Sequence, residues 1–349
     1  MITENAVREE IASQGKNALI QRLKEFFKLE NTTSVSGVEN DAAVYCHNDE
    51  CEVLASQLFV EHVNFDLSYF PLKHLGYKVI VATVSDLLAM NALPTHLRLN
   101  LAVSNRFSVD ALEEFVSGAA ICCKRLGIDL VGLDITSSVM GFAISVTLSG
   151  SVKKGNVVTR ANAKENELIC VTGDLASAYT GLLILEREKK VFQVNPHEQP
   201  DLAGYDYVLE RQLKPEARIE TIRDLAQQGI LPTSMINVKD GIASALLHIC
   251  NASKTGCQIF EEKLPIDTVT FNTLKELKIV ATTVALSGGE DYELLFTVKQ
   301  DDYEKIKKIP EISVIGYITP QSSGCHLISN DNRQIELRAQ EFYAENANS

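Results

Sequence analysis

Hydrophobic residues recur at helical spacing in three stretches of the N-terminal half. This spacing predicts helices over residues 7–28, 71–92 and 109–126. Ser108 stands where the third helix needs an N-cap, and Gly127 stands where that helix is expected to end. The N-terminal half is therefore expected to carry three helices with clear polar and hydrophobic faces.

The segments between these helices have the pattern of strands. The expected strands cover Ala42–Tyr45, Glu52–Phe59, Leu97–Val103, Ile128–Leu133 and Gly141–Val152. We therefore expect an α+β unit, with helices laid over one largely antiparallel sheet. The polar stretch Ser151–Glu167 follows, so we place a domain boundary near residue 150, with one domain over 1–150 and a second over 151–349.

The second half alternates between the two patterns. Helices are expected over 174–189, 215–228 and 241–254 and near 301–308. Strands are expected over 167–171, 234–238, 257–261, 292–298, 312–318, 324–329 and 334–338. These elements predict a second α/β layer domain, so the fold class is α/β (α+β) with two domains.

Composition narrows the classes of partner. The chain has 349 residues, of which 45% are hydrophobic and 23% are charged, and its net charge is -13. This negative charge argues against nucleic acid or an anionic membrane surface as the main partner. The first residues have no secretory pattern, and no run of about 18 apolar residues is present, so we expect a cytoplasmic protein.

The eight cysteines include no CxxC pair. Cys46 and Cys51, with His47 between them, resemble half of a metal clip, but no second pair has the spacing of a zinc finger. We therefore expect reduced cysteines that are scattered through strands and helices.

Acidic residues gather at several corners of the chain. In the stretch SGGEDYELLFT, Glu290, Asp291 and Glu293 lie within four residues of a glycine-rich turn. Asp41, Asp134, Asp240 and Asp291 each stand where an apolar segment ends or a turn opens, and Asp86 lies inside a predicted helix. Any one of them suits a cap or a turn, but together they indicate carboxylates that converge on a hard cation such as Mg²⁺.

Mg²⁺ usually bridges carboxylates to substrate phosphates, and phosphoryl transfer asks the protein mainly for positioning and charge neutralisation. The chain has neither a GxxxxGK[ST] motif nor the glycine-rich loop of protein kinases. A nucleotide site in this chain must therefore be of another kind.

The order of the motifs GVENDAAV, VATVSDLLAMNALP, LVGLDITSS, INVKDGIAS and SGGEDYELLFT resembles the bacterial thiamine-monophosphate kinase family of the aminoimidazole-ribonucleotide-synthetase superfamily. The resemblance runs from the N-terminal helix to about residue 318. It implies an N-terminal ATP- and metal-binding domain whose sheet pairs in a homodimer, and a C-terminal α/β domain. It also implies ATP and several Mg²⁺ ions, with the γ-phosphate transferred to thiamine monophosphate to give thiamine diphosphate.

The resemblance assigns roles residue by residue. The expected metal ligands are Asp41, Asp86, Asp134 and Asp240. The expected nucleotide-binding residues are Asp134, Arg160 and Lys239, and the expected catalytic residues are Asp240 and Lys239. Glu290 and Asn64 are expected to face the thiamine substrate, and Phe342 or Tyr343 is the candidate for an aromatic ring stacked on it.

Several positions depart from the family pattern. Asn40, Gln57 and Asn237 each replace an expected acidic residue, and Lys239 replaces a phosphate-facing serine. Asn64 replaces a histidine, Leu133 replaces a glycine beside the nucleotide, and Ala245 replaces a further aspartate. The charge changes share one sign. Because a unit charge pair at about 4 Å is worth about 4 kcal/mol at an effective dielectric constant near 20, Lys239 is expected to displace at least one Mg²⁺.

Two readings of these changes stay open. In the first, the protein is a working kinase with fewer metal ions, and Lys239 acts as a fixed positive charge on the phosphates. In the second, it is a catalytically silent relative that keeps the fold and binds a ligand or a partner. A selenophosphate-synthetase-like activity fits less well, because no glycine-rich segment with a reactive cysteine precedes Gly37.

Overall fold

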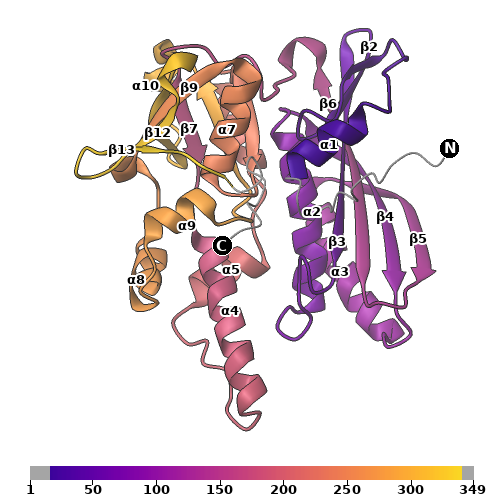
Figure 1. The fold of residues 1–349 in the computed structure, drawn as a ribbon. Helices are drawn as coiled ribbons and strands as arrows, with labels where there is room; N and C mark the ends of the chain where they lie inside the picture. The colour runs from indigo at the N-terminus through magenta and orange to yellow at the C-terminus, as the bar shows by residue number, and fades with distance from the viewer. Residues whose placement is uncertain (1–15, 340–349) are drawn as a thin grey trace, which may run out of the picture.

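The computed structural model describes residues 16–339, which fold around two mixed sheets (Figure 1). The N-terminal sheet has the strand order β1-β2-β3-β6-β4-β5. Its strands are β1 (Ser34–Ser36), β2 (Ala43–His47), β3 (Glu50–Val60), β4 (Leu93–Val103), β5 (Asp129–Ser137) and β6 (Ala143–Lys153). Every neighbouring pair is antiparallel except β4 and β5, which confirms the largely antiparallel sheet predicted from the alternating pattern.

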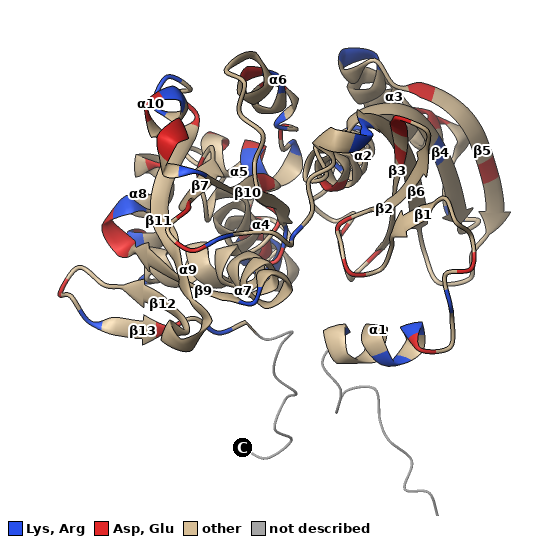
Figure 2. Cartoon of the chain, turned by 90° about the horizontal axis from the view of Figure 1, so that it is seen from above, with Lys and Arg blue, Asp and Glu red and all other residues tan. Residues whose placement is uncertain are grey.

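Among the described residues, this half has three helices, namely α1 (Lys16–Lys24), α2 (Leu72–Leu88) and α3 (Val109–Leu126). Ser108 caps α3 by accepting a hydrogen bond from the amide of Ala111, and Gly127 ends the helix with a positive φ of 71°, as predicted. Every residue of α2 from Leu75 to Leu88 is buried. Seen from above, α2 lies between the N-terminal sheet and the C-terminal half (Figure 2).

The C-terminal sheet has the strand order β13-β12-β9-β11-β7-β10-β8. Its strands are β7 (Leu168–Thr172), β8 (Ser234–Val238), β9 (Thr255–Phe260), β10 (Glu293–Val298), β11 (Ile312–Pro320), β12 (Cys325–Ile328) and β13 (Gln334–Glu336). The helices of this half are α4 (Ser177–Val194), α5 (Asp206–Leu213), α6 (Ile219–Gln227), α7 (Ile242–Ser253), α8 (Thr268–Glu276), α9 (Ala281–Ser287) and α10 (Tyr303–Ile306). Short 3₁₀ turns cover Lys154–Asn156, Glu261–Lys263, Gln300–Asp302 and Gln321–Ser323.

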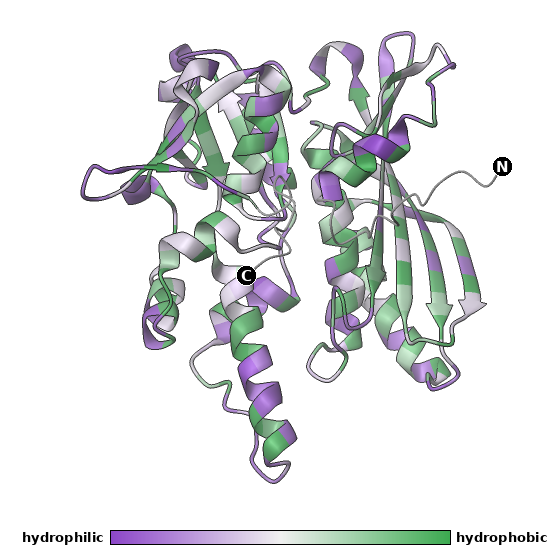
Figure 3. Ribbon diagram, viewed as in Figure 1, coloured by the Kyte–Doolittle hydropathy of each residue, from purple (hydrophilic) through white to green (hydrophobic). Residues whose placement is uncertain are grey.

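Two hydrophobic cores lie on opposite faces of the C-terminal sheet. Strand β10 shows this directly, because Leu294 and Phe296 belong to the core that includes α2, whereas Leu295 belongs to the core beneath α7. Burial on both faces explains why β10 reads as a continuous apolar run. The hydropathy colouring shows hydrophobic residues along α2 and along the strands on which it packs (Figure 3).

Some predicted elements differ from the structure. Helix α2 ends at Leu88 rather than at Ala92, and β4 already begins at Leu93. Helices α5, α8 and α9 were not predicted. The segment Thr268–Ser287 is rich in Thr and Val, whose propensities favour strands, and packing on α4 and α7 decides for helix instead. The first part of the helix expected over 7–28 and the candidates Phe342 and Tyr343 lie outside the described residues.

The expectation that all cysteines are reduced is wrong for Cys46 and Cys51, which form a disulfide. The two residues face each other across the hairpin of β2 and β3, and antiparallel pairing brings their Cα atoms to 4.0 Å. Cysteine usage therefore no longer supports a reducing compartment. Among the described residues, no helix combines the length and the apolar character that crossing a membrane requires.

Candidate functional site

Asp86 is a predicted metal ligand with a buried side chain. It lies on the buried helix α2, and the exposed fraction of its side chain is 3%. The amide of Gln57 on β3 donates to one carboxylate oxygen at 2.5 Å, and the amide of Asn237 on β8 donates to the other at 2.8 Å. Both halves of the protein therefore hold this carboxylate.

Lys239 reaches the same carboxylate from the loop after β8. Its Nζ lies 3.6 Å from Oδ1 of Asp86. The negative charge of Asp86 raises the pKa of Lys239, and Asp41 and Asp240 add to this effect. Burial raises the pKa of Asp86, whereas the positive charge of Lys239 acts to lower it. Lys239 is therefore a fixed positive charge among three carboxylates.

Arg160 neutralises a second carboxylate of this group. Its Nε and Nη2 donate to the two oxygens of Asp41 at 3.2 and 3.0 Å, and the side chain of Asp41 is fully buried. The amide of Arg160 donates to the side-chain oxygen of Asn40 at 3.3 Å. Arg160 also lies 3.4 Å from the Nδ1 of His248 on α7. We call Asp41, Asp86, Arg160, Lys239 and Asp240 the junction cluster.

Asp240 is the exposed member of the junction cluster. Its loop is held against the SGGEDYELL corner, since the carbonyl of Lys239 accepts from the amide of Glu290 at 2.9 Å. Gly241 has a positive φ of 85°, and a Cβ there would meet the carbonyl oxygens of Leu286 and Gly288 at 2.5 and 2.7 Å. Glycine is therefore required for the close approach of the two loops that present Asp240.

Glu290 occupies a separate position on the same corner. It has a positive φ of 67°, and its carboxylate accepts from the Nζ of Lys78 at 2.8 Å and from the amide of Gln212 at 3.0 Å. The exposed fraction of its side chain is 29%. Glu290 is thus fixed in direction by two donors and still open to a ligand.

The other two acids of the corner stabilise the fold. Asp291 accepts hydrogen bonds from the amides of Ala176 and Ala178 at the start of α4. Glu293 is fully buried and pairs with Arg211 at 2.7 Å and with Arg218 at 2.5 Å. The sequence left both without a role, and their contacts now give each a structural one.

Three residues with expected roles lie apart from the junction cluster. Asp134 and Leu133 are exposed on β5, at the outer edge of the N-terminal sheet (Figure 1). Asn64 is exposed, and its side-chain oxygen accepts from the amide of Val60 and so closes its own turn. Within residues 16–339, no hydrogen bond or ion pair joins Asn64 to Glu290.

The contacts that each carboxylate already makes show where a divalent cation fits. At Asp86 each oxygen already accepts from an amide N–H, and a lysine ammonium lies beside it, so a second cation does not fit there. Asp240 accepts no hydrogen bond from the described residues and faces solvent. One or two carboxylates with phosphate oxygens and water make an ordinary Mg²⁺ site, so Asp240 fits Mg²⁺ held together with a phosphate ligand.

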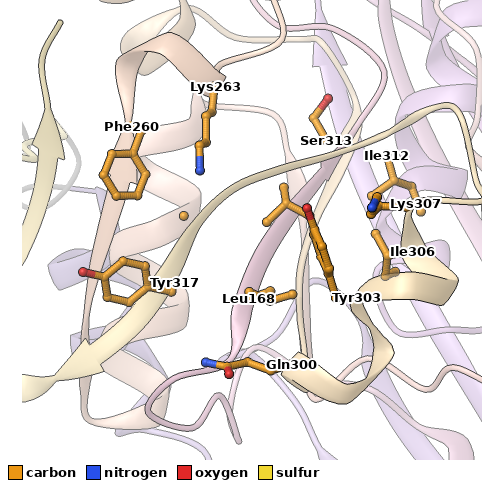
Figure 4. Close-up of a pocket in the computed structure, with 12 residues that line it drawn as sticks. Leu168, Phe260, Lys263, Gln300, Tyr303, Ile306, Lys307, Ile312, Ser313 and Tyr317 are labelled. Atoms are coloured by element: carbon orange, nitrogen blue, oxygen red, sulfur yellow. The ribbon is translucent and has the colours of Figure 1, made fainter.

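A cavity of about 710 Å³ lies elsewhere, beside β11 and α10 (Figure 4). None of the predicted site residues lines it. Its lysines are already placed over aromatic rings, since the Nζ of Lys263 lies 4.8 Å from the ring centre of Phe260 and that of Lys307 lies 5.0 Å from Tyr303. This cavity is therefore separate from the junction cluster.

Sequence reasoning missed Lys78, Gln212 and His248. Lys78 carries the one usable signal, because a lysine inside an otherwise apolar helix needs a buried partner. Gln212 and His248 stand in helices with ordinary amphipathic patterns, and only the tertiary structure brings them to Glu290 and Arg160.

Comparisons with known proteins agree with this architecture. The family model described as AIR synthase related protein, N-terminal domain, matches residues 39–152. The thiamine-monophosphate kinase of Bacillus subtilis (strain 168) is 30% identical over 309 residues, which are 86% of this chain and 90% of that protein. None of the comparisons supports the catalytically silent reading.

Solved structures also show similarity to thiamine-monophosphate kinases. The thiamine-monophosphate kinase from Stenotrophomonas maltophilia K279a superposes with a TM-score of 0.70 at 28% identity, covering 93% of this chain and 98% of that one. A structure described as AaThiL complexed with AMPPCP and TMP has a TM-score of 0.79 at 24% identity over 95% and 98% of the two chains, which establishes the fold. The chain belongs to the thiamine-monophosphate kinase family.

Proposed function

We propose that this protein transfers the γ-phosphate of ATP to thiamine monophosphate and forms thiamine diphosphate and ADP. The observation that carries the proposal is the near full-length similarity to a thiamine-monophosphate kinase, combined with a junction cluster of three carboxylates and two fixed cations. A structural relative described with AMPPCP and TMP supports an ATP-like nucleotide and thiamine monophosphate as the two ligands.

The reaction breaks the bond between the γ-phosphorus of ATP and the oxygen that bridges it to the β-phosphate. A phosphate oxygen of thiamine monophosphate forms the new bond. Such transfers need positioning and charge neutralisation more than acid–base chemistry. Lys239 is suited to the γ-phosphate, because Asp86 fixes its direction while about a third of its side chain stays exposed (32%).

Arg160 is suited to the remaining phosphate oxygens. Asp41 holds its Nε and Nη2, and His248 lies beside Nη1, so the guanidinium plane has one orientation. Asp240 would hold Mg²⁺, which neutralises phosphate charge when it is bound. In this scheme Lys239 takes over part of that neutralisation at Asp86, so we expect fewer Mg²⁺ ions than four metal-facing aspartates would suggest.

Glu290 is suited to the thiamine part of the substrate, which carries a positive charge. Lys78 and Gln212 orient the carboxylate, and its partial exposure leaves room for the cationic ring. Asn64 and Asp134 stay candidates for substrate and for nucleotide or metal, respectively, on the resemblance alone. We keep the cytoplasm as the expected location.

A homodimer through the N-terminal sheet is part of the proposal. Strand β5 is an edge strand, and Val131, Leu133 and Ile135 alternate along it with exposed fractions of 65, 49 and 55%. An exposed apolar edge of this kind is a site for pairing with another chain. Replacing Ile135 by Lys should halve the mass measured by light scattering, and an unchanged mass would place the dimer contact elsewhere.

The experiment that tests the activity follows thiamine diphosphate formation from Mg-ATP and thiamine monophosphate over time. Turnover is expected for the wild type, a loss of about a hundred-fold for Asp240→Asn, and no loss for the exposed control Asp49→Asn. No turnover by a folded wild-type protein would contradict the proposal and leave catalytic silence.

A further inference from the structure

Three thiols meet on the far side of α7 from the junction cluster. The sulfur atoms of Cys250 on α7, Cys257 on β9 and Cys325 on β12 all lie within 4.8 Å of one another. Cys250 and Cys257 are almost fully buried, whereas Cys325 is partly exposed. The three elements adjoin in the C-terminal half (Figure 1). We call these residues the trithiol cluster.

The backbone fixes each of the three cysteines. Cys325 is directly opposite Cys257 in the parallel pair β9 and β12, so their side chains leave the sheet on the same face. The amide of Cys257 donates to the carbonyl of Gly324 at 3.1 Å, and the carbonyl of Cys325 accepts from Leu337 at 2.9 Å. The carbonyl of Cys250 accepts from Lys254, which closes the end of α7. The sulfurs are therefore held in place without a ligand.

Core packing accounts for single buried cysteines, because a thiol behaves as a small apolar group. It does not require three sulfurs within 4.8 Å of one another. The Thr255 hydroxyl, two residues before Cys257 on the same face of β9, is also buried and lies beside the thiol of Cys250. Three sulfurs and a buried hydroxyl gathered at one place suit a bound cation better than an apolar core.

We propose that the trithiol cluster binds one thiophilic closed-shell cation of the zinc class. Zinc lies about 2.3 Å from a thiolate sulfur, so a trigonal set of three sulfurs is about 4 Å apart, which agrees with the spacing here. Among the described residues no fourth His, Cys, Asp or Glu joins the group, so water takes the remaining position on the exposed side of Cys325.

Binding forms three metal–sulfur bonds, and the protons of the three thiols leave to the buffer. The complex then carries one net negative charge, which the solvent beside Cys325 can screen. The cation would tie the end of α7 to β9 and β12. Since α7 begins directly after Asp240 and Gly241, the site would stabilise the helix that carries His248 toward Arg160.

The test uses the full chain, reduced and stripped of metal, and titrates it with Cd²⁺ while thiolate-to-metal absorption is recorded. Zn²⁺ is then added as a competitor. We expect one Cd²⁺ per chain, displaced by Zn²⁺, and at least a ten-fold loss of affinity in Cys250→Ser, Cys257→Ser and Cys325→Ser. Cys170→Ser is the matched control, because Cys170 is buried in β7 of the same sheet and lies outside the trithiol cluster.

The absence of thiolate absorption, or equal affinity in all four variants, would overturn the proposal. A disulfide between two of the three cysteines in the purified protein would also overturn it. If the variants do not fold, alkylation of wild-type Cys325 gives the answer. Zn²⁺ should slow this reaction several-fold, and an unchanged rate would contradict the site.

Discussion

Asp86 and Glu293 are both buried carboxylates next to cations, yet their surroundings differ. Glu293 accepts from two arginines and from the hydroxyl of Thr172, all within the C-terminal half. Asp86 accepts from two neutral amides, and its only close cation within residues 16–339 is Lys239, which is 3.6 Å away and partly open to solvent. The negative charge of Glu293 is thus neutralised by its neighbours, whereas that of Asp86 is neutralised less completely.

These different surroundings suit the two carboxylates to different roles, one in stability and one in function. A carboxylate enclosed by two guanidinium groups has no capacity left for a ligand and stabilises the fold. A carboxylate that holds a partly exposed lysine leaves positive charge available to a phosphate. By this comparison Glu293 with Arg211 and Arg218 is structural, and the junction cluster is the place where we propose that the chemistry occurs.

The largest effect is expected for Glu293→Gln. The change leaves Arg211 and Arg218 without their shared anion, and breaking such a buried pair costs about 3–5 kcal/mol. Denaturant unfolding measures the loss. The control is Glu311→Gln, which removes only the exposed partner of Arg218 and should cost less than about 1 kcal/mol. Equal losses for the two variants would remove the distinction between the clusters.

Lys239→Met is expected to lower turnover about a hundred-fold, because one fixed charge on the transferred phosphate is lost. Its stability should fall by less than that of Glu293→Gln, since the side chain is partly exposed. Steady-state kinetics at saturating ATP, with denaturation of the same samples, checks both points. A large loss of stability with unchanged turnover would reverse the roles given to Lys239 and Glu293.

A pH effect of intermediate size is expected for Asp291. Burial raises the pKa of its carboxyl to about 7, far above the ordinary value near 3.8. Between these two values the folded state binds more protons than the unfolded state, so stability rises as the pH falls from 8 to 5. Asp291 should contribute about 3 kcal/mol to this rise.

The measurement is denaturant unfolding of the wild type and of Asp291→Asn at pH 8 and pH 5. The difference between the two proteins should change by about 3 kcal/mol in favour of the wild type at pH 5. A difference that is the same at both pH values would show that Asp291 is ionised throughout.

The smallest effect is expected at an ion pair between the two halves. Lys189 pairs with Asp66 at 2.8 Å, and Lys189→Met should cost about 1 kcal/mol, because Asp66 keeps its hydrogen bond from the amide of Ser68. Thermal unfolding at low and high salt measures this contribution. A much larger cost would mean that this single pair also holds the two halves together, and would weaken the contrast between Glu293 and Asp86.

The elements with strong patterns could be predicted from the sequence. The apolar run of α2, the cap at Ser108 and the end at Gly127 are local signals, and local physics decides them. Helices α8 and α9 could not be predicted, because their Thr- and Val-rich sequences become helical only through packing.

The sequence predicted which residues belong to the site, but not which of them form ion pairs with one another. The acids and Lys239 were identified from motifs, whereas Asp41 and Arg160 are 119 residues apart and nothing local indicates their ion pair. The same holds for the contact of Lys78 with Glu290, which depends on how the two sheets meet. The metal, nucleotide and substrate roles given to individual residues stay predictions.

The most direct test is a crystal structure with AMPPCP, thiamine monophosphate and Mg²⁺. We predict that the Nζ of Lys239 and the guanidinium of Arg160 lie within hydrogen-bonding distance of phosphate oxygens, with Mg²⁺ at Asp240 and none at Asp86. A Mg²⁺ ion bound to Asp86, with Lys239 turned away from the nucleotide, would contradict the account.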